Sequence, residues 1–398
     1  MFRTIQILFG LTALVALSAL PAGAVTCAAD NVPAATLLLP YFEVDLSSRT
    51  GADTIFSINN AYADAAIAKV EVWTDLGVPI FGFNVYLTGY DVEVIDLRDI
   101  LLYGILPDTM TGSPPPSCPK EALAPGPLPA ATLADYQSAF TGNPVPSLGG
   151  KCAAVNRGDK IARGYITVDS VTSCTTQLPT TPGYFAGVAG TANVLWGDFS
   201  LVNLDRKEAF GDPLVHIEAD TASAETAVAG NYTFYGRYIG WNASDRREPL
   251  PTTFGARYTN LSPFDGDGDL IVWRDPKVNQ LPFTCPVSPG VRPAWYPLGQ
   301  EVYLAFDEQE NAVAPHTRPF PAATQRVPVS SLGLPYGAGW LFLNLNASVA
   351  AAGPNPPEDP RAAQAWVMTV MSDKDGVLKS GYDAMQYDSA CRSRHFKP

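Results

Sequence analysis

Charged side chains are scarce in this chain: only 16% of its 398 residues are Asp, Glu, Lys or Arg, whereas about 25% is usual for a soluble protein. Long solvated helices and a disordered acidic tail are therefore disfavoured, because both need a denser array of charges. The charges that are present are mostly negative, and the formal net charge is −13. This balance disfavours nucleic-acid binding, since phosphate groups require a basic surface.

Histidine and the common catalytic motifs are also lacking. The chain has three histidines, His216, His316 and His395, so a histidine-rich metal centre is difficult to assemble. It contains no G-x-S-x-G, Walker A or H-E-x-x-H motif. Nucleotide binding and the familiar hydrolase mechanisms thus have no support in the sequence. Glycoside hydrolysis stays open, because it needs only two carboxylates about 5 to 10 Å apart.

Long apolar runs are confined to the N-terminus. Arg3 is followed by the apolar stretch 5–20 and then by Pro21 and the small residues Ala22, Gly23 and Ala24. This order is typical of a secretory signal peptide, which we predict at residues 1–24, with an uncleaved anchor as the alternative. No later stretch is long and apolar enough for a transmembrane helix. We expect an exported protein of the periplasm, the cell surface or the extracellular medium.

Six cysteines follow this leader, and none belongs to a C-x-x-C pair. An even number of cysteines in an exported chain predicts up to three disulfides. Three of the six lie between residues 118 and 174, so full pairing requires at least one bridge that leaves this region. The candidates are Cys27, Cys118, Cys152, Cys174, Cys285 and Cys391.

Period-two alternation is the clearest structural signal. In the stretch 66–75, Ala68, Val70 and Val72 share one face, and Lys69 and Glu71 share the other. This pattern predicts a half-buried strand with a second sheet over its apolar face. The stretch 81–88 alternates in the same way, and the residues between the two predict a hairpin.

The segment 87–97 reads Leu-Thr-Gly-Tyr-Asp-Val-Glu-Val-Ile-Asp-Leu. It resembles the strand, turn and strand that end immunoglobulin-like sandwiches of bacterial surface proteins, with Thr88 where those usually have proline. More narrowly, the stretch 36–100 is similar to secreted bacterial proteins without a known activity, through its Leu-Leu-Leu-Pro-Tyr-Phe-Glu-Val and Val-Trp-Thr-Asp runs. The resemblance implies an immunoglobulin-like module at residues 25–106 and brings no activity with it.

A change of composition follows this module. Residues 107–150 contain 10 prolines in 44 positions, which predicts a linker or cross-linked loop over residues 107–160. A short helix is expected at Thr132 to Phe140. From residue 161 onward roughly ten strand-like stretches predict a larger β-sandwich domain, residues 161–398, built as one sandwich or two. The fold class is therefore all-β with tandem sandwiches. Within it, residues 364–371 form a strand or, alternatively, residues 361–371 form a helix after Pro360.

Three alternating carboxylates form the sharpest local motif. Asp265, Asp267 and Asp269 are separated by glycines, so the backbone can curl and present several oxygens to Ca²⁺. The motif resembles calcium loops but lacks the glycine and glutamate of an EF-hand, since Leu270 and Pro276 stand at those positions. A simple Ca²⁺ loop and a plain acidic turn are the two interpretations.

Two further patterns have a chemical and a structural interpretation. On a strand, His216, Glu218 and Asp220 project from one face, as either an acid/base or metal site or a solvated face. The aromatic stretch 232–241, which includes Phe234 and Tyr235, forms either a sugar-stacking platform or part of the core.

These observations predict an exported structural or binding protein of the cell surface or periplasm that does not catalyse a reaction. Its expected partners are cell-surface proteins or polysaccharide. The alternatives are a secreted polysaccharide hydrolase with a Ca²⁺ loop and a carbohydrate-binding module.

Overall fold

A computed structural model shows a mostly β protein whose neighbouring strands run antiparallel, so the all-β sandwich class is confirmed. The predicted signal peptide, residues 1–24, lies outside the described residues. Those are 31–110, 112–221, 233–235, 245–259, 268–275, 281–285, 296–299, 302–314, 319–345, 364–373 and 379–389.

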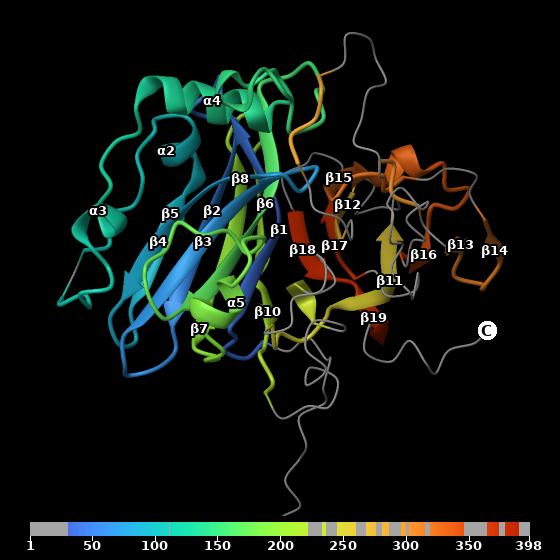
Figure 1. The fold of residues 1–398 in the computed structure, drawn as a ribbon. Helices are drawn as coiled ribbons and strands as arrows, with labels where there is room; N and C mark the ends of the chain where they lie inside the picture. Colours follow the sequence, from blue (N-terminus) through green and yellow to red (C-terminus); the bar gives the residue numbers. More distant parts are fainter. Residues whose placement is uncertain are drawn as a thin grey trace, which may run out of the picture.

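Two sheets build the first sandwich (Figure 1). The first sheet has the order β10-β1-β6-β3-β4. Its strands are β1 (Thr36–Asp45), β3 (Ala66–Thr74), β4 (Pro79–Leu87), β6 (Ile161–Val171) and β10 (Val215–Ile217). The second sheet has the order β5-β2-β8-β9, and β7 also pairs with β2. Its strands are β2 (Ala52–Asn60), β5 (Val92–Asp96), β7 (Leu195–Trp196), β8 (Asp198–Asn203) and β9 (Glu208–Pro213).

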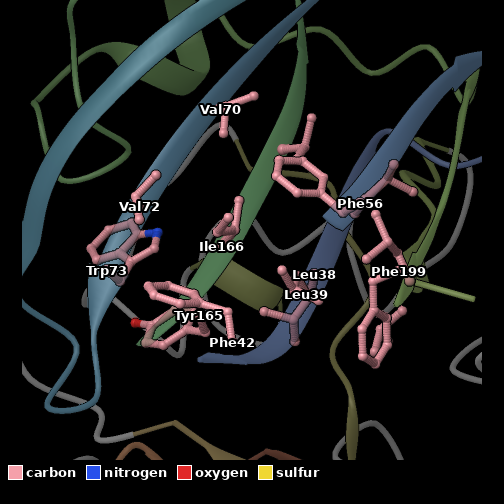
Figure 2. Packing of buried hydrophobic residues seen from close by; sticks show 14 of the residues in the cluster. Leu38, Leu39, Phe42, Phe56, Val70, Val72, Trp73, Tyr165, Ile166 and Phe199 are labelled. Atoms are coloured by element: carbon pink, nitrogen blue, oxygen red, sulfur yellow. The ribbon is translucent and has the colours of Figure 1, made fainter. Parts of the chain in front are cut away.

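Figure 2 shows part of the buried cluster, with Phe56 and Phe199 of the second sheet near Val70 and Ile166 of the first. Val70 of β3 and Ile166 of β6 belong to one buried cluster with Phe56 of β2 and Phe199 of β8. The hairpin predicted from alternation is also present, since β3 pairs with β4 from Ala66 to Trp73. The apolar positions of the alternating pattern therefore supply the core, as expected.

The opposite face of β3 differs from the prediction. Alternation predicts a half-buried strand, yet Lys69 and Glu71 are only 2% and 1% exposed. In the register of β3 and β6, Lys69 lies opposite Asp169, and Asp169 accepts hydrogen bonds from Tyr184 and Tyr235. Later parts of the chain thus cover this face, which is why local alternation could not reveal its burial.

Short helices close the ends of the first sandwich. They are α2 (Leu97–Leu101), α3 (Lys120–Leu123), α4 (Ala130–Phe140) and α5 (Tyr184–Gly187), with the 3-10 turn η1 (Pro146–Leu148). A second 3-10 turn, η2 (Val329–Leu332), belongs to the second sandwich described below. Helix α4 contains the predicted helix, and its Tyr136 stacks on Phe81 with ring centres 4.5 Å apart. Within the described part of the chain, every helix is too short or too polar to span a bilayer.

Two more sheets build a second sandwich. The third sheet, β15-β12-β17-β18, consists of β12 (Asp269–Arg274), β15 (Thr324–Pro328), β17 (Ala365–Ser372) and β18 (Lys379–Asp383). The fourth sheet, β14-β13-β16-β11-β19, consists of β11 (Pro251–Thr259), β13 (Val302–Phe306), β14 (Ala312–Val313), β16 (Ala338–Asn344) and β19 (Met385–Ser389). Residues 365–372 form a strand, so the helix alternative for this stretch is wrong.

The third sheet packs on both of its faces. Ile271 and Trp273 of β12 pack toward the first sandwich, and the Trp273 ring lies edge-on to Tyr165 on the outer face of the first sheet with centres 5.9 Å apart. Leu270 and Val272 belong to a separate core with the fourth sheet. The third sheet therefore lies between the first sheet and the fourth. This explains why all six residues of β12 are buried, because a sheet covered on both sides needs no solvated face.

The sheets divide the chain at a different place from the predicted boundary after residue 160. Strand β6 begins at Ile161, yet it lies between β1 and β3 of the first sheet. Strands β8 and β9 likewise complete the sheet of β2 and β5. The module predicted at residues 25–106 thus obtains its central strand from the region assigned to the next domain, because strand pairing is not a local property of the sequence.

Two disulfides join distant parts of the described chain. Cys118 is bonded to Cys174, and Cys152 is bonded to Cys285. The second bond leaves the region 118–174, as the count of cysteines predicts. Cys27 and Cys391 lie outside the described residues.

Candidate functional site

A cleft of about 820 Å³ opens at the end of the first sheet where β3 begins and β6 ends. Its floor is one row of neighbouring side chains, since Ile67 of β3 lies opposite Val171 of β6 and Tyr86 of β4. The walls include the turn before β3, the Pro-rich segment at Ser113 and the loop at Thr191. Five separate parts of the chain therefore form this hollow.

Asn60 holds the turn that forms one wall. Its side-chain amide donates to the carbonyl oxygens of Asp64 at 2.6 Å and Thr88 at 3.0 Å. The backbone N–H of Tyr62 donates to Asn60 Oδ1 at 3.1 Å, and that of Tyr90 donates to the Tyr62 carbonyl at 2.8 Å. The backbone on both sides of Tyr62 is thus fixed, while 53% of the residue stays exposed at the rim of the cleft.

The opposite wall is anchored to β6 and to a buried cation. The N–H of Gly190 donates to the carbonyl of Ser170 at 2.7 Å, and the Gly190 carbonyl accepts from Arg247 Nη2 at 3.1 Å. Next to it, the N–H of Thr172 donates to the Val188 carbonyl at 2.9 Å. Both walls are therefore held by backbone hydrogen bonds, so the cleft is preformed.

The lining combines eight apolar residues or glycine with six hydroxyl-bearing residues and little charge. The hydroxyl-bearing residues are Tyr62, Tyr86, Ser113, Ser170, Thr172 and Thr191. Two of the hydroxyls donate within the protein, Tyr86 to the Ser113 carbonyl and Thr172 to the Val188 carbonyl, each at 3.2 Å. Asp64 is the one charged residue among the described residues that line the cleft. A lining with one carboxylate and no cation suits a neutral ligand that can donate hydrogen bonds better than an anionic one.

The floor of the cleft continues into a buried polar layer on the same face of the first sheet. We use this name for Lys69, Glu71, Asp169 and Arg247. Lys69 lies two residues along β3 from Ile67, so both side chains project from one face. The layer therefore lies directly behind the cleft and supports it from within the protein.

Asp169 is the centre of this layer. Its carboxylate accepts hydrogen bonds from the hydroxyls of Thr36 at 2.5 Å, Tyr184 at 2.8 Å and Tyr235 at 3.1 Å. Arg247 Nε lies 3.5 Å from Asp169 Oδ1. Burial raises the pKa of Asp169, although the Arg247 charge and the three hydroxyl donors act in the opposite direction. These contacts fasten α5 and residues 233–235 to the first sheet.

Lys69 and Glu71 form the second pair of the layer, with Nζ 3.3 Å from Oε2. Burial raises the pKa of Glu71 to about 7, even though Lys69 lowers it. Gly82 of β4 makes room for this pair, because a β-carbon there would overlap the ends of both side chains. Glycine is therefore required at position 82 because the two side chains lie directly against its α-carbon.

The cleft and the polar layer contain no recognisable sequence motif. No protein-family model matches this chain, and no curated protein or solved structure matches it either. The resemblance of residues 25–106 to immunoglobulin-like surface proteins accordingly stays a prediction.

Of the predicted calcium ligands, Asp269 lies in β12, and Asp265 and Asp267 lie outside the described residues. The Asp269 carboxylate accepts a hydrogen bond from Arg326 Nε at 2.8 Å. Arg326 also pairs with Glu208 of β9, so Asp269 takes part in contacts between the two sandwiches. Within the described segments, no group of three His, Cys, Asp or Glu side chains is placed to hold a metal ion. The calcium loop stays a prediction.

His216 is a packed residue and is not solvated. Its ring stacks on Trp196 with centres 5.7 Å apart, and its Nδ1 lies 3.0 Å from Asn31 Oδ1. Burial lowers the pKa of His216 to about 4, so the ring is neutral at physiological pH. Strand β10 ends at Ile217, and the regular alternation that would place Glu218 and Asp220 beside His216 therefore stops.

The two described members of the aromatic stretch belong to the core. Phe234 stacks on Trp273 with ring centres 5.7 Å apart, and the Tyr235 hydroxyl donates to Asp169. Tyr232 and Trp241 lie outside the described residues. For Phe234 and Tyr235 the packing interpretation holds, and the stacking platform is not formed by them.

Tyr62 and Asp64 belong to no motif that the sequence shows. Both stand in a turn of mixed composition, and only the exposed ring of Tyr62 distinguishes it in the structure. The residues before β3 predict only a loop. They do not predict a binding site, because the other walls of the cleft come from parts of the chain that are distant in sequence.

Proposed function

We propose that this chain is an exported binding protein that does not catalyse a reaction and takes a neutral carbohydrate in the cleft. The observation that carries the proposal is the half-exposed Tyr62 residue at the rim of a preformed hollow that is lined by apolar and hydroxyl-bearing residues. An aromatic ring packs against the C–H groups of a sugar while polar groups around it satisfy the hydroxyls. The role is that of a binding component of the cell surface or periplasm.

Asp64 and the hydroxyl residues define the expected ligand more closely. A carboxylate accepts strong hydrogen bonds from sugar hydroxyls. An acidic sugar would instead meet Asp64 without a cation in the described lining to balance its charge. The chain as a whole carries a formal charge of −13, which also opposes anionic ligands.

Export is supported by the predicted signal peptide and by the two disulfides. The Cys118–Cys174 and Cys152–Cys285 bonds join residues 56 and 133 positions apart in sequence. Structural disulfides of this kind persist in oxidising compartments. The disulfides and the predicted signal peptide therefore both support a location outside the cytoplasm.

A panel of neutral and acidic polysaccharides and their oligosaccharides tests the proposal. We expect binding to at least one neutral member by isothermal titration calorimetry, and a loss of about 1 to 3 kcal/mol in Tyr62→Ala, the scale of a buried aromatic contact. Tyr103→Ala is the matched control, because Tyr103 is also partly exposed and does not line the cleft.

Three results contradict the proposal. They are failure of every panel member to bind, equal binding by wild type and Tyr62→Ala, and preference for acidic sugars. Reducing ends are assayed in the same samples, and their release would identify the alternative, a polysaccharide hydrolase.

A further inference from the structure

Strand β5 forms an open edge of the second sheet. It pairs with β2 on one side, and no other strand in the described part of the chain pairs with it. The register with β2 runs from Ile55 to Asn59 without a bulge. Proteins usually protect such edges with charged side chains, above all lysine, with proline or a bulge, or by keeping the strand short. β5 has no lysine, proline or bulge, and the charges on its five residues, Val-Glu-Val-Ile-Asp, are both negative.

An apolar strip follows this edge. Val92 and Val94 are 55% and 61% exposed, and they project from the same face because they are two residues apart. Tyr90, which is 70% exposed, precedes them, and its backbone is bonded to that of Tyr62. Single exposed apolar residues are normal on a protein surface. Here three of them, Tyr90, Val92 and Val94, are grouped at one unpaired edge.

The surroundings of the strip are acidic. Residues 90–99 contain four carboxylates, Asp91, Glu93, Asp96 and Asp99. Burial raises the pKa of Glu93, and the nearby charges of Asp91 and Asp108 raise it further, so carboxylates crowd this edge. The one cation of the segment, Arg98, is engaged, with Nη1 3.2 Å from Asp53 Oδ2.

The negative charges beside β5 therefore determine which kind of partner can bind at this edge. A second copy of the chain would bring its own carboxylates against these, and repulsion would oppose that pairing. A cationic segment gains from the same charges. We propose that the β5 edge docks an extended, cationic segment of a partner protein, which adds a strand to the second sheet through backbone hydrogen bonds. Its alternate apolar side chains lie on Val92 and Val94, and its lysines or arginines lie beside the acids.

The proposal does not depend on the cleft, and it is tested with a separate probe. The probe is a fluorescein-labelled ten-residue peptide of alternating valine and lysine, titrated with the full chain and read by fluorescence anisotropy. We expect saturable binding that weakens as salt is raised. A peptide of alternating valine and glutamate is expected not to bind, and N-methylation at alternate residues of the lysine peptide abolishes binding by removing backbone donors.

Val94→Lys tests the site itself, because a lysine on an open edge opposes strand addition and repels the peptide. We expect its affinity for the lysine peptide to fall by about tenfold or more. Val313→Lys is the matched control: Val313 is an exposed valine on β14, which is the edge strand of the fourth sheet. That variant is expected to bind within about twofold of wild type, since the two sites are independent.

Several outcomes overturn the proposal. They are no binding of the lysine peptide, equal weakening in both variants, and full binding of the N-methylated peptide. A wild-type dimer in light scattering that Val94→Lys dissolves would show that the edge is occupied by a second copy. Circular dichroism of both variants confirms that each is folded before it is compared.

Discussion

Arg326 of β15 forms an ion pair with Glu208 of β9 and thereby joins the two sandwiches. The same guanidinium lies 3.6 Å from Glu43 of β1 and 5.4 Å from the centre of the Phe210 ring. Burial acts to raise the pKa of Glu208, but Arg326 and Lys379 outweigh it, so this pKa lies below its ordinary value. Arg326 and Lys379 thus both favour the ionised form of Glu208.

Replacement of Arg326 is expected to be strongly destabilising. Arg326→Met leaves the carboxylates of Glu208 and Asp269 without their main partner, and breaking a buried ion pair in this way costs about 3 to 5 kcal/mol. The measurement is the urea midpoint at pH 7. The control is Arg257→Met, whose partner Glu308 is exposed with it, and which should lose at most about 1 kcal/mol. Equal losses in the two variants would contradict the role of Arg326.

The Lys69–Glu71 pair predicts a specific pH dependence. The pKa of Glu71 rises from an ordinary 4.5 to about 7 on folding, because of burial. The folded state then binds a proton at Glu71 more tightly than the unfolded state. The free energy of unfolding is therefore highest below about pH 4.5, where Glu71 is protonated in both states. It falls by about 3 kcal/mol as the pH rises through about 7.

In Lys69→Met the loss of stability with rising pH should continue above pH 7. Without the cation, burial raises the pKa of Glu71 further, so stability continues to fall above pH 7 and the variant lies about 3 to 5 kcal/mol below wild type at pH 8. The double variant Lys69→Met with Glu71→Leu should recover most of the difference, since an apolar pair of similar volume replaces the charges. Urea midpoints from pH 5 to 9 provide the comparison. Parallel pH profiles for wild type and the double variant would refute this account.

Gly82→Ala should destabilise the protein by about 1 to 3 kcal/mol, because the added methyl group overlaps the ends of Lys69 and Glu71. Gly187→Ala is the control, since a β-carbon at Gly187 in α5 meets no atom within 4 Å. The control should be neutral or stabilising by up to about 1 kcal/mol. Thermal melting of both variants provides the comparison. Because the added carbon would also lie 2.5 Å from the Val70 carbonyl oxygen, a tolerant position 82 would mean that the backbone shifts as well as the charged pair.

The two disulfides should differ in their contribution to stability. Cys152–Cys285 links residues 133 apart in sequence, and Cys118–Cys174 links residues 56 apart. Loop-closure entropy predicts about 4 to 5 kcal/mol for each, with about 0.8 kcal/mol more for the longer loop. The paired Cys→Ala variants are compared by urea unfolding. A larger loss on removing Cys118–Cys174 would contradict the entropic estimate.

Local sequence determined the strands and their apolar faces. Val70 and Val72 alternate with polar residues, and this pattern predicts β3, its hairpin with β4 and its contribution to a core. The short helix α4 was likewise visible from the spacing of its apolar residues. These features follow from the two-residue repeat of a strand and the turn of a helix, which neighbouring residues set by themselves.

Tertiary structure alone decided which strands pair and what covers each face. The insertion of β6 between β1 and β3 brings Asp169 beside Lys69, about a hundred residues away in sequence. It also brings Val171 beside Ile67 and so forms the floor of the cleft. Alternation shows which side chains share a face, but the partner of that face is chosen by packing between residues that are distant along the chain.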